Sequence, residues 1–287
     1  MKKKILITGA NSPVGIDITD CLDKNFYNLS ISFNKRKNLI KKYEKVKKIK
    51  IDLTKKIRIK KESFYALVHL ASATPFRKYD KKTYEKINLN GLRKILNHFN
   101  FDKIILLSTT AIYNVDNKIS SETSAKNPKS NYTFTKLKME EILVEFAKKH
   151  KKEILILRCP AILCKTKNNI NFIEKLRYGY FGSKKLKIFN PNQLYNNLID
   201  TAEISKVIIY FLKNKLKFRA INIFNLAASQ PTKIYDVIKL ILKRTKKYNE
   251  LKKIYNKKKQ HTVISLKKIA SIGYKTKSLY SIIKSNI

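Results

Sequence analysis

Short apolar runs alternate with helical stripes through the first half of the chain, and this alternation constrains the fold more than any other feature. The runs are rich in β-branched residues and too short for helices, so they predict buried strands at 5–7, 29–33, 49–53, 66–70, 104–107 and 154–157. Residues 80–99 and 132–150 carry apolar stripes at helical spacing between some of these runs. The pattern predicts an α/β fold with a doubly wound, mostly parallel sheet.

The alternation of predicted strands and helices becomes less regular after about residue 160. Residues 165–197 are polar and irregular, and helical patterns return near 201–213 and 232–243. We therefore expect a sheet domain over residues 1–160. A smaller lobe over residues 161–287, interleaved with the first, would lie at the carboxyl edge of the sheet.

The chain carries 64 basic and 20 acidic residues, for a formal net charge of +44. Almost all of the basic residues are lysines, spread along the whole chain among many Ile and Asn residues, which is typical of an AT-rich coding genome. Since no basic stripe with interleaved aromatic residues stands out, we favour compositional bias over a nucleic-acid partner. Such a charge still attracts phosphorylated substrates at low salt.

The three cysteines are Cys21, Cys159 and Cys164, with no CxxC spacing and no histidine in metal-ligand register. This usage favours a reduced, cytoplasmic protein without a metal site. The apolar run after the basic N-terminus is too short for a signal peptide, and no segment reaches the ~18 apolar residues of a membrane span. We expect no membrane association.

A glycine-containing turn follows the first predicted strand. Gly9 suits a tight turn, and Gly15 would let the next helix pack close to the sheet with its N-terminus facing a pyrophosphate. Ser12 stands at the middle position, which is usually glycine. The turn predicts a dinucleotide site formed by Gly9, Asn11, Ser12, Pro13, Val14 and Gly15. A plain strand-to-helix turn is the alternative.

The residues after the second predicted strand bear on the choice between NAD and NADP. An acid about twenty residues past the last glycine usually holds the adenosine ribose of NAD. Here the strand is followed by Asn34, Lys35 and Arg36, so the acid is missing and a cation is available for a 2′-phosphate. Arg36 carries more weight than Lys35 because arginine is rare in this chain. The cofactor would be NADP or NAD, with NADP slightly favoured.

Tyr132 and Lys136 lie one helical turn apart at the start of the helix that follows the strand at 104–107. A neighbouring ammonium favours the phenolate form of a tyrosine and so makes it a usable acid/base. In a chain so rich in Tyr and Lys the spacing alone is weak, and the position selects this pair. Hydroxyls at Ser108, Thr109 and Thr110 end the strand, where one could donate a hydrogen bond to a substrate oxygen or simply cap the loop.

Taken together, these motifs resemble an extended short-chain dehydrogenase/reductase of the NAD-dependent epimerase/dehydratase family, over essentially the whole chain. The resemblance rests on Thr8-Gly9…Gly15, Ile51-Asp52-Leu53, His69-Leu70-Ala71-Ser72, Asn88-Leu89-Asn90-Gly91, Ser108-Thr109…Tyr113, Glu122…Pro128…Tyr132…Lys136 and Leu157-Arg158-Cys159-Pro160. It implies an NAD(P)-binding Rossmann domain over 1–160 and a substrate-binding lobe over 161–287.

The resemblance also implies roles for individual residues. Tyr132 would be the general acid/base, Lys136 its pKa partner and a ribose contact, and Thr109 the hydrogen-bond donor to the reacting oxygen. Contacts to the remainder of the cofactor would come from Asp52 and Leu53 at the adenine, Leu70 and Ala71 along its length, and Pro160 near the nicotinamide.

Four further polar residues have two interpretations each. Asn88 would be part of the active-site backing or a satisfied core amide, and His69 is better explained as a packing residue at a strand end than as a catalyst. Arg77 and Arg177 are hypothetical contacts of a substrate diphosphate, with ordinary surface cations as the alternative.

The reaction stays open between two classes. Dehydratases of this family place an Asp-Glu pair directly after the threonine, whereas Thr109 is followed here by Thr110 and Ala111, so dehydration is disfavoured. A nucleotide-sugar epimerase and a 4-keto-sugar reductase remain near equals. The alternative is a non-catalytic relative that binds NADP or RNA. Asn114, where glycine is usual, and Cys164-Lys165, where Gly-Pro is frequent, leave the sugar undefined. The small-molecule substrate would be a sugar nucleotide, and a homodimer is compatible with the resemblance.

Overall fold

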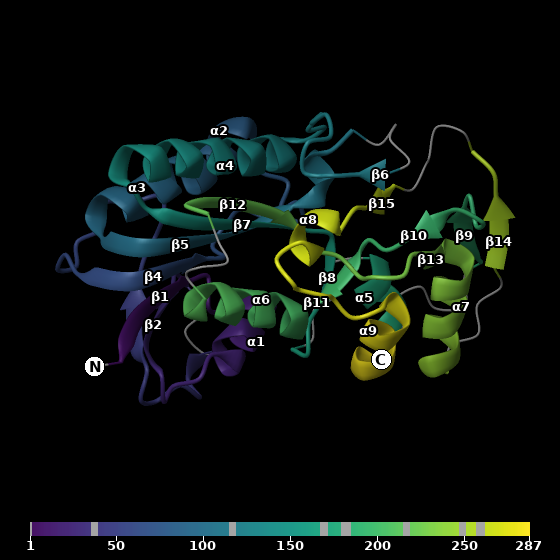
Figure 1. Ribbon diagram of the computed structural model, residues 1–287, viewed down its shortest axis with the longest axis horizontal. Coiled ribbons are helices and arrows are strands. Elements are labelled where there is room, and N and C mark those ends of the chain that lie inside the picture. Colours follow the sequence, from purple (N-terminus) through teal and green to yellow (C-terminus); the bar gives the residue numbers. More distant parts are fainter. Residues whose placement is uncertain are drawn as a thin grey trace.

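A computed structural model describes residues 2–35, 40–114, 119–166, 172–178, 185–214, 219–246, 251–256 and 262–287. Its centre is a seven-stranded sheet in the order β12-β7-β5-β4-β1-β2-β3, in which every neighbouring pair is parallel (Figure 1). The strands are β1 (Lys3–Thr8), β2 (Tyr27–Phe33), β3 (Lys47–Lys50), β4 (Ser63–His69), β5 (Asn100–Thr109), β7 (Glu153–Cys159) and β12 (Ile221–Asn225).

Helices cover both faces of this sheet. One face carries α2 (Lys81–Tyr84), α3 (Gly91–His98) and α4 (Asn131–His150), and the other carries α1 (Pro13–Cys21) and α6 (Thr201–Lys213) (Figure 1). Alternate residues of β1 show why: Ile5 and Ile7 pack in the core on one side, and Leu6 packs in the core on the other. A strand buried on both faces has the continuous apolar run seen in the sequence, which confirms the predicted doubly wound fold.

All six predicted strands are present, with two differences at the sheet edges. β3 ends at Lys50 rather than at residue 53, because the Asp52 carboxylate accepts hydrogen bonds from the backbone and hydroxyl of Thr54 and turns the chain. β12 was not predicted. Asn222 and Asn225 interrupt the apolar residues of this strand. Their side chains are buried because they donate to backbone carbonyls, and a search for apolar runs does not detect such residues.

The stripe at 80–99 is not one regular helix. A π-helical turn (η2, Glu85–Asn90) separates α2 from α3 and turns Asn88 into the core. The Asn88 amide accepts from the backbone N of Ala73 at 2.7 Å and donates to Thr135 Oγ1 of α4 at 2.9 Å. Asn88 is therefore a satisfied core amide, and it also links two helices.

The second half builds small two-stranded sheets at the carboxyl end of the main sheet (Figure 1). Their strands are β6 (Ile119–Ser120) with β15 (Val263–Ile264), β8 (Ala161–Leu163) with β11 (Leu198–Asp200), β9 (Leu186–Phe189) with β14 (Leu251–Ile254), and β10 (Leu194–Tyr195) with β13 (Thr232–Lys233). Helices α5 (Phe172–Arg177), α7 (Ile234–Arg244), α8 (Lys267–Ala270) and α9 (Leu279–Asn286) complete this half. The prediction that 165–197 is irregular was therefore wrong for α5, β9 and β10.

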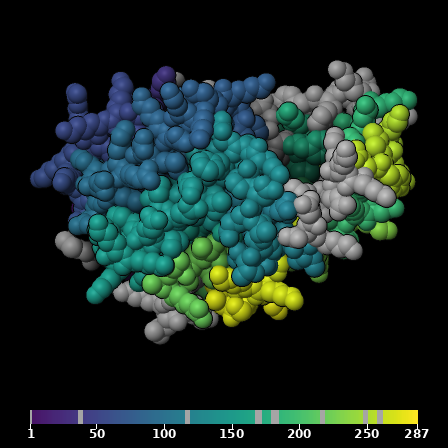
Figure 2. Space-filling model, turned by 90° about the horizontal axis from the view of Figure 1, so that it is seen from above, coloured from purple at the N-terminus to yellow at the C-terminus, as the bar shows by residue number. Residues whose placement is uncertain are grey.

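Both halves of the chain contribute to the main sheet layer, since β12 and α6 come from the second half and pack there. In Figure 2 the first half, from blue to teal, covers most of the visible face, and green and yellow segments of the second half lie along its margins. The division near residue 160, with an interleaved second lobe, stays a prediction. No helix in the described ranges is long and apolar enough to cross a bilayer.

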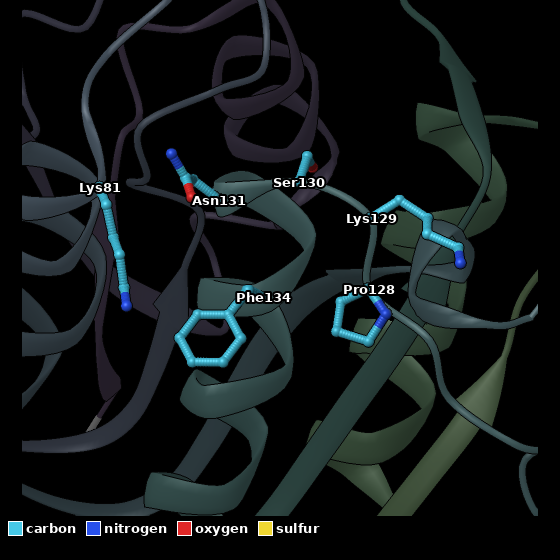
Figure 3. A pocket seen from close by; sticks show the side chains of 6 residues that line it. All are labelled: Lys81, Pro128, Lys129, Ser130, Asn131 and Phe134. Carbon is cyan, nitrogen blue, oxygen red and sulfur yellow. The ribbon is translucent and has the colours of Figure 1, made fainter.

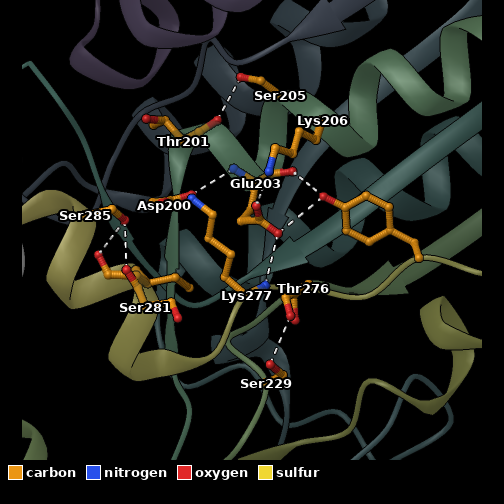
Figure 4. Close-up of polar contacts among 12 residues, drawn as sticks. Asp200, Thr201, Glu203, Ser205, Lys206, Ser229, Thr276, Lys277, Ser281 and Ser285 are labelled. Atoms are coloured by element: carbon orange, nitrogen blue, oxygen red, sulfur yellow. Dashed lines mark hydrogen bonds and ion pairs between the residues drawn. The ribbon is translucent and has the colours of Figure 1, made fainter.

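The C-terminal segment is fixed to α6 by a buried carboxylate. Glu203 accepts hydrogen bonds from the backbone N of Lys277 at 3.2 Å and from Lys206 Nζ at 3.0 Å, and Ser229 Oγ donates to the carbonyl of Thr276 (Figure 4). The bond from Lys277 holds the C-terminal segment against α6, one of the helices that cover the sheet.

The close approach of α3 to the β3 turn generates a stability prediction. A Cβ at Gly91 would lie 2.7 Å from Leu53 Cβ, so Gly91→Ala should lower the free energy of unfolding by about 1–3 kcal/mol through overpacking. Urea denaturation measures it. Because Leu53→Gly removes the Cβ that this methyl group would meet, the double variant should lose less than the sum of the two single variants. Additive losses would contradict the predicted clash.

Candidate active site

The turn after β1 lies at the point where the strand order reverses. β2 and β3 lie on one side of β1 and β4 on the other, and open α/β sheets bind ligands at such a point. Gly9 has φ +70°, and a Cβ there would lie 2.7 Å from the backbone N of Ala71. A Cβ on Gly15 would lie 2.7 Å from Ala10 Cα. Both predicted glycine roles, tight turn and close helix packing, are therefore present.

Ser12 does more than replace a glycine. It is the N-cap of α1: its hydroxyl accepts from the backbone N of Gly15 at 3.0 Å and donates to the carbonyl of Gly9 at 2.8 Å. Pro13 follows at the first helical position, where its missing N–H costs nothing. Asn11 and Val14 lie in the same turn and first helical turn.

The predicted adenosine end lies at the carboxyl ends of β2 and β3. Asn34 and Lys35 are exposed just after β2, and Arg36 lies outside the described residues. Burial raises the pKa of Asp52, but the hydrogen bonds from Thr54 and the charges of Lys55 and Lys35 outweigh it, so the pKa falls below its usual value. Asp52 is thus a carboxylate with a cation from the β2 turn nearby.

The end of β4 contacts the β1 turn directly. The backbone N of Leu70 donates to the carbonyl of Thr8 at 3.2 Å, and the backbone N of Ala71 to its hydroxyl at 3.4 Å. His69 is 1% exposed, with Nδ1 2.8 Å from Thr8 Oγ1. Burial and the nearby charge of Lys136 lower the pKa of His69 to about 3, so its imidazole is neutral. The interpretation of His69 as a strand-end packing residue fits this environment.

Thr109 is the last residue of β5 and lies beside Cys159, the last residue of β7. Its hydroxyl accepts from the backbone N of Ala111 at 3.2 Å, and its own proton is left to donate. The hydroxyl therefore caps the loop, and its predicted hydrogen bond to a substrate oxygen stays a prediction.

Tyr132 lies in the first turn of α4. The helix begins there because Ser130 and Thr133 form a capping box, in which each side chain bonds the backbone N of the other. The hydroxyl of Tyr132 makes no hydrogen bond to any residue in the described ranges. Burial raises the pKa of Tyr132, with smaller contributions from Cys159 and Tyr84, so the side chain is a phenol at neutral pH.

Lys136 lies one turn further along α4 and is 3% exposed. Its Nζ donates to the carbonyl of Leu107 in β5 at 2.5 Å. Burial lowers the pKa of Lys136 to about 8, while the carboxylate of Glu140 opposes the shift. The predicted catalytic residues Thr109, Tyr132 and Lys136 thus lie at the same sheet edge, on β5 and the helix packed against it.

The sequence did not predict the buried polar network behind this site. Glu140 on α4 and Arg158 on β7 form an ion pair with a closest N–O distance of 2.7 Å, and both side chains are under 5% exposed. Arg158 also donates to Tyr113 Oη at 2.8 Å, and Tyr113 donates to Asn225 Oδ1 of β12 at 2.6 Å. Two features of the sequence could have indicated this network: Arg158 is one of few arginines, and Glu140 is an acid on the apolar stripe of its predicted helix.

The remaining predicted residues lie nearer the margin. Pro160 joins β7 to β8 and is half-buried. Arg177 donates to the carbonyl of Cys164 at 2.7 Å and pairs with Glu174 at 3.5 Å, while Arg77 is exposed and donates to Tyr79 Oη. Arg177 therefore holds the loop after β8, and its predicted diphosphate contact stays a prediction, as does that of Arg77.

An open pocket of about 280 Å³ lies at the N-terminal end of α4 (Figure 3). It is lined by Lys81, Pro128, Lys129, Ser130, Asn131 and Phe134. None of these is a predicted site residue, but Asn131 directly precedes Tyr132. Among the described residues, no cluster of three or more His, Cys, Asp or Glu could hold a metal ion.

Comparison with known proteins gives one family and many related folds. Residues 2–271 match the family described as RmlD substrate binding domain, and no curated protein matches the sequence. UDP-glucuronic acid 4-epimerase from Bacillus cereus, solved with NAD, is 22% identical, with a TM-score of 0.79 over 99% of this chain and 95% of that one. UDP-N-acetylglucosamine 4-epimerase from Methanobrevibacter ruminantium is 19% identical, with a TM-score of 0.76 over 99% of this chain and 98% of that one.

ADP-L-glycero-D-manno-heptose-6-epimerase from Helicobacter pylori is 18% identical, with a TM-score of 0.79 over 99% of this chain and 95% of that one. At these identities the structures establish a shared fold.

Ser12 provides a matched pair of variants that tests its capping role. Ser12→Ala removes the hydroxyl that accepts from Gly15 and should lower the free energy of unfolding by about 1 kcal/mol, whereas Ser12→Gly should cost only a few tenths. Urea denaturation measures both. Equal losses for the two variants would contradict the N-cap.

The buried Lys136 ammonium predicts a pH-dependent cost to stability. Below pH 8 Lys136 is protonated in both states, so the folded protein bears the full cost of burying the charge. Between pH 8 and about 10.5 the folded chain has lost this proton while the unfolded chain still binds it, so the cost decreases and the protein becomes more stable as the pH rises. Lys136→Met should therefore raise the free energy of unfolding at pH 7 by roughly 2–3 kcal/mol, with no gain above about pH 10.5. Lys138→Met, at an exposed position of the same helix, is the control. A loss of stability at pH 7 in the Lys136 variant would overturn this prediction.

Proposed function

Because the chain belongs to the family described as RmlD substrate binding domain, and its motifs and fold are those of extended short-chain dehydrogenases/reductases, we propose that it is an NAD(P)-dependent enzyme. Its substrate is the sugar of a sugar nucleotide, which it epimerises or reduces as a 4-keto-sugar. The observation that carries the proposal is the placement of Tyr132 on α4, one helical turn before the buried Lys136 at the carboxyl edge of the sheet, with a hydroxyl that makes no hydrogen bond to any described residue.

The cofactor fits the chain's own geometry. Gly9 adopts a positive φ and, like Gly15, has no room for a Cβ, so the turn brings backbone N–H groups and the N-terminus of α1 to one point. The residues that would hold the cofactor are Gly9, Asn11, Ser12, Pro13, Val14 and Gly15 at the pyrophosphate, Asn34, Arg36, Asp52 and Leu53 at the adenosine, and Leu70, Ala71, Lys136 and Pro160 toward the nicotinamide. When bound, a nicotinamide supplies the two-electron oxidation or reduction of a sugar carbon.

NADP is the slightly favoured cofactor. No acid follows β2, and Lys35 is exposed at the position where a 2′-phosphate would meet it. Lys35 also lies close enough to Asp52 to lower the pKa of that carboxyl. Asp52 already accepts hydrogen bonds from Thr54 and lies near a lysine. Its carboxylate is therefore better suited to border the adenine than to accept hydrogen bonds from the ribose hydroxyls.

Proton transfer falls to Tyr132. As a phenol it can donate its proton to the carbonyl oxygen of a keto-sugar, and as a phenolate it can take the proton back from the alcohol. Lys136 lies one turn away with a buried positive charge that stabilises the phenolate. Thr109 keeps a hydroxyl proton for the same sugar oxygen, where negative charge develops during either reaction.

Loss of the Tyr132 hydroxyl tests the proposed chemistry. Tyr132→Phe should reduce kcat by about 10²–10⁴-fold on whichever sugar nucleotide of a UDP-, ADP- and dTDP-sugar panel the wild type converts. Tyr280→Phe, at a residue 57% exposed, should keep full activity. Full turnover by Tyr132→Phe would overturn the mechanism, and salt-sensitive RNA binding without any turnover would favour a non-catalytic relative.

Identifying the cofactor separates the two reactions. Mass spectrometry of the small molecules released from denatured protein shows whether NAD or NADP is already bound, and titration with NADH and NADPH shows which nucleotide an empty site prefers. Tightly held NAD would indicate an epimerase that recycles it, and an empty site with tighter binding of NADPH than of NADH would indicate a reductase. Binding of neither nucleotide by protein with an intact Gly9 turn would contradict the proposed function.

A further inference from the structure

Glu140 is a buried acid with an unusual set of partners. It lies on α4 one turn after Lys136 and is 3% exposed. Its carboxylate accepts from Ser108 Oγ at 2.5 Å and from the guanidinium of Arg158 through Nε at 3.1 Å and Nη2 at 2.7 Å. A carboxylate so removed from water persists as an anion because these donors replace its hydration.

The partners of Glu140 connect the elements that carry the proposed catalytic groups. Ser108 directly precedes Thr109 on β5, and Arg158 directly precedes Cys159 on β7. The far end of the Arg158 side chain donates from Nη1 to Tyr113 Oη at 2.8 Å and to the carbonyl of Glu122 at 3.1 Å. Glu140 thus bonds the helix of Tyr132 and Lys136 to the strand that ends at Thr109, in addition to the bond from Lys136 to the carbonyl of Leu107.

Three titratable groups from three elements face the ammonium of Lys136: Glu140 on its own helix, His69 on β4 and Cys159 on β7. Burial lowers the pKa of His69 to about 3 and raises the pKa of Cys159, so both are neutral at pH 7. Tyr132, whose pKa burial also raises, is neutral too. Of these groups only Glu140 carries a charge, and it is negative.

We propose that Glu140 is a positioning residue whose buried carboxylate keeps Lys136 protonated and holds α4 in register with Thr109. This inference rests on the proposed function, in which a charged Lys136 stabilises the Tyr132 phenolate. Without the carboxylate, none of the titratable groups that face Lys136 would be an anion at pH 7, and the hydrogen bond to the carbonyl of Leu107 would be left to offset the cost of burying the lysine's charge. The lysine would then lose its proton at a lower pH, and the phenolate would lose its support.

The test needs a variant that removes the charge and still folds. Glu140→Gln alone leaves Arg158 buried and unpaired, which destabilises proteins strongly, so the main variant is Glu140→Gln with Arg158→Met. Glu140→Asp is the second variant, because it keeps the anion but moves it away from Lys136. The matched control is Glu203→Gln, which neutralises another buried, lysine-paired carboxylate on α6.

The measurement is the titration of Lys136 in the full chain, by NMR of protein labelled at lysine Nζ and Cε. The Lys136 signal is assigned by its absence in Lys136→Met, and it should titrate near pH 8, apart from the surface lysines. Its pKa should fall by about one unit in the double variant, by less in Glu140→Asp, and not at all in Glu203→Gln. An unchanged Lys136 pKa in a folded double variant, or in Glu140→Asp if only that variant folds, would overturn the proposal.

A rate profile then separates this inference from the proposed function. With the sugar nucleotide that the wild type converts, kcat should fall at high pH as Lys136 loses its proton. In the double variant this fall should occur at a lower pH, because the pKa of Lys136 is lower. If Tyr132→Phe keeps full turnover, the proposed function fails, yet the NMR titration still tests the electrostatic role of Glu140. If Tyr132→Phe is inactive while the profile of the double variant matches wild type, the positioning role alone fails.

Discussion

The buried ion pair between Glu140 and Arg158 is the interaction on which the arrangement of this site depends. It joins the helix of the proposed acid/base to two neighbouring strands, and through Tyr113 and Asn225 it reaches the edge strand from the second half of the chain. Breaking such a pair leaves a charge stranded in the core, which typically costs about 3–5 kcal/mol. The pair therefore favours the observed packing of α4 on β5 and β7, with Tyr132 in the first turn of that helix and Thr109 at the end of β5.

The same constraint explains how so basic a chain builds an apolar core. Of its many cations, only Lys103, Lys136 and Arg158 are buried in the described part of the chain. Each has a specific partner: Glu153 for Lys103, the carbonyl of Leu107 for Lys136, and Glu140 for Arg158. The excess lysines therefore occupy exposed positions, where a lysine has little effect on stability. They are rare in the core, where an unpaired charge would be strongly destabilising. Buried cations in this chain mark structural or chemical roles.

Most of the sheet could be predicted because strands buried on both faces leave continuous apolar runs, and so could the Gly9 turn, whose glycines are needed by backbone geometry alone. Features held by side-chain amides and carboxylates could not. Asn222 and Asn225 interrupt the pattern of β12. A core amide was one of the two interpretations of Asn88, but the π-helical turn around it leaves no sign in the periodicity. Ser12 resembled a substituted glycine until its capping bonds were seen. The buried asparagines bond partners distant in sequence, which pattern reasoning has no means of finding, whereas the capping bonds of Ser12 are local.

In the proposed reaction, Tyr132 exchanges a proton with a sugar whose carbon is oxidised or reduced by the nicotinamide of the cofactor. Rapid mixing of cofactor-loaded protein with sugar nucleotides, followed through the ultraviolet absorbance of the reduced nicotinamide, tests it most directly. The account predicts a change in that absorbance in the wild type. Deuterium on the carbon that gives up the hydride, which is the sugar carbon in an oxidation and the nicotinamide C4 in a reduction, should slow the change. In Tyr132→Phe the change should be slowed to near absence although the cofactor is still bound. A wild type that shows no change with any sugar nucleotide, or a Tyr132→Phe variant that matches it in rate, would contradict the account.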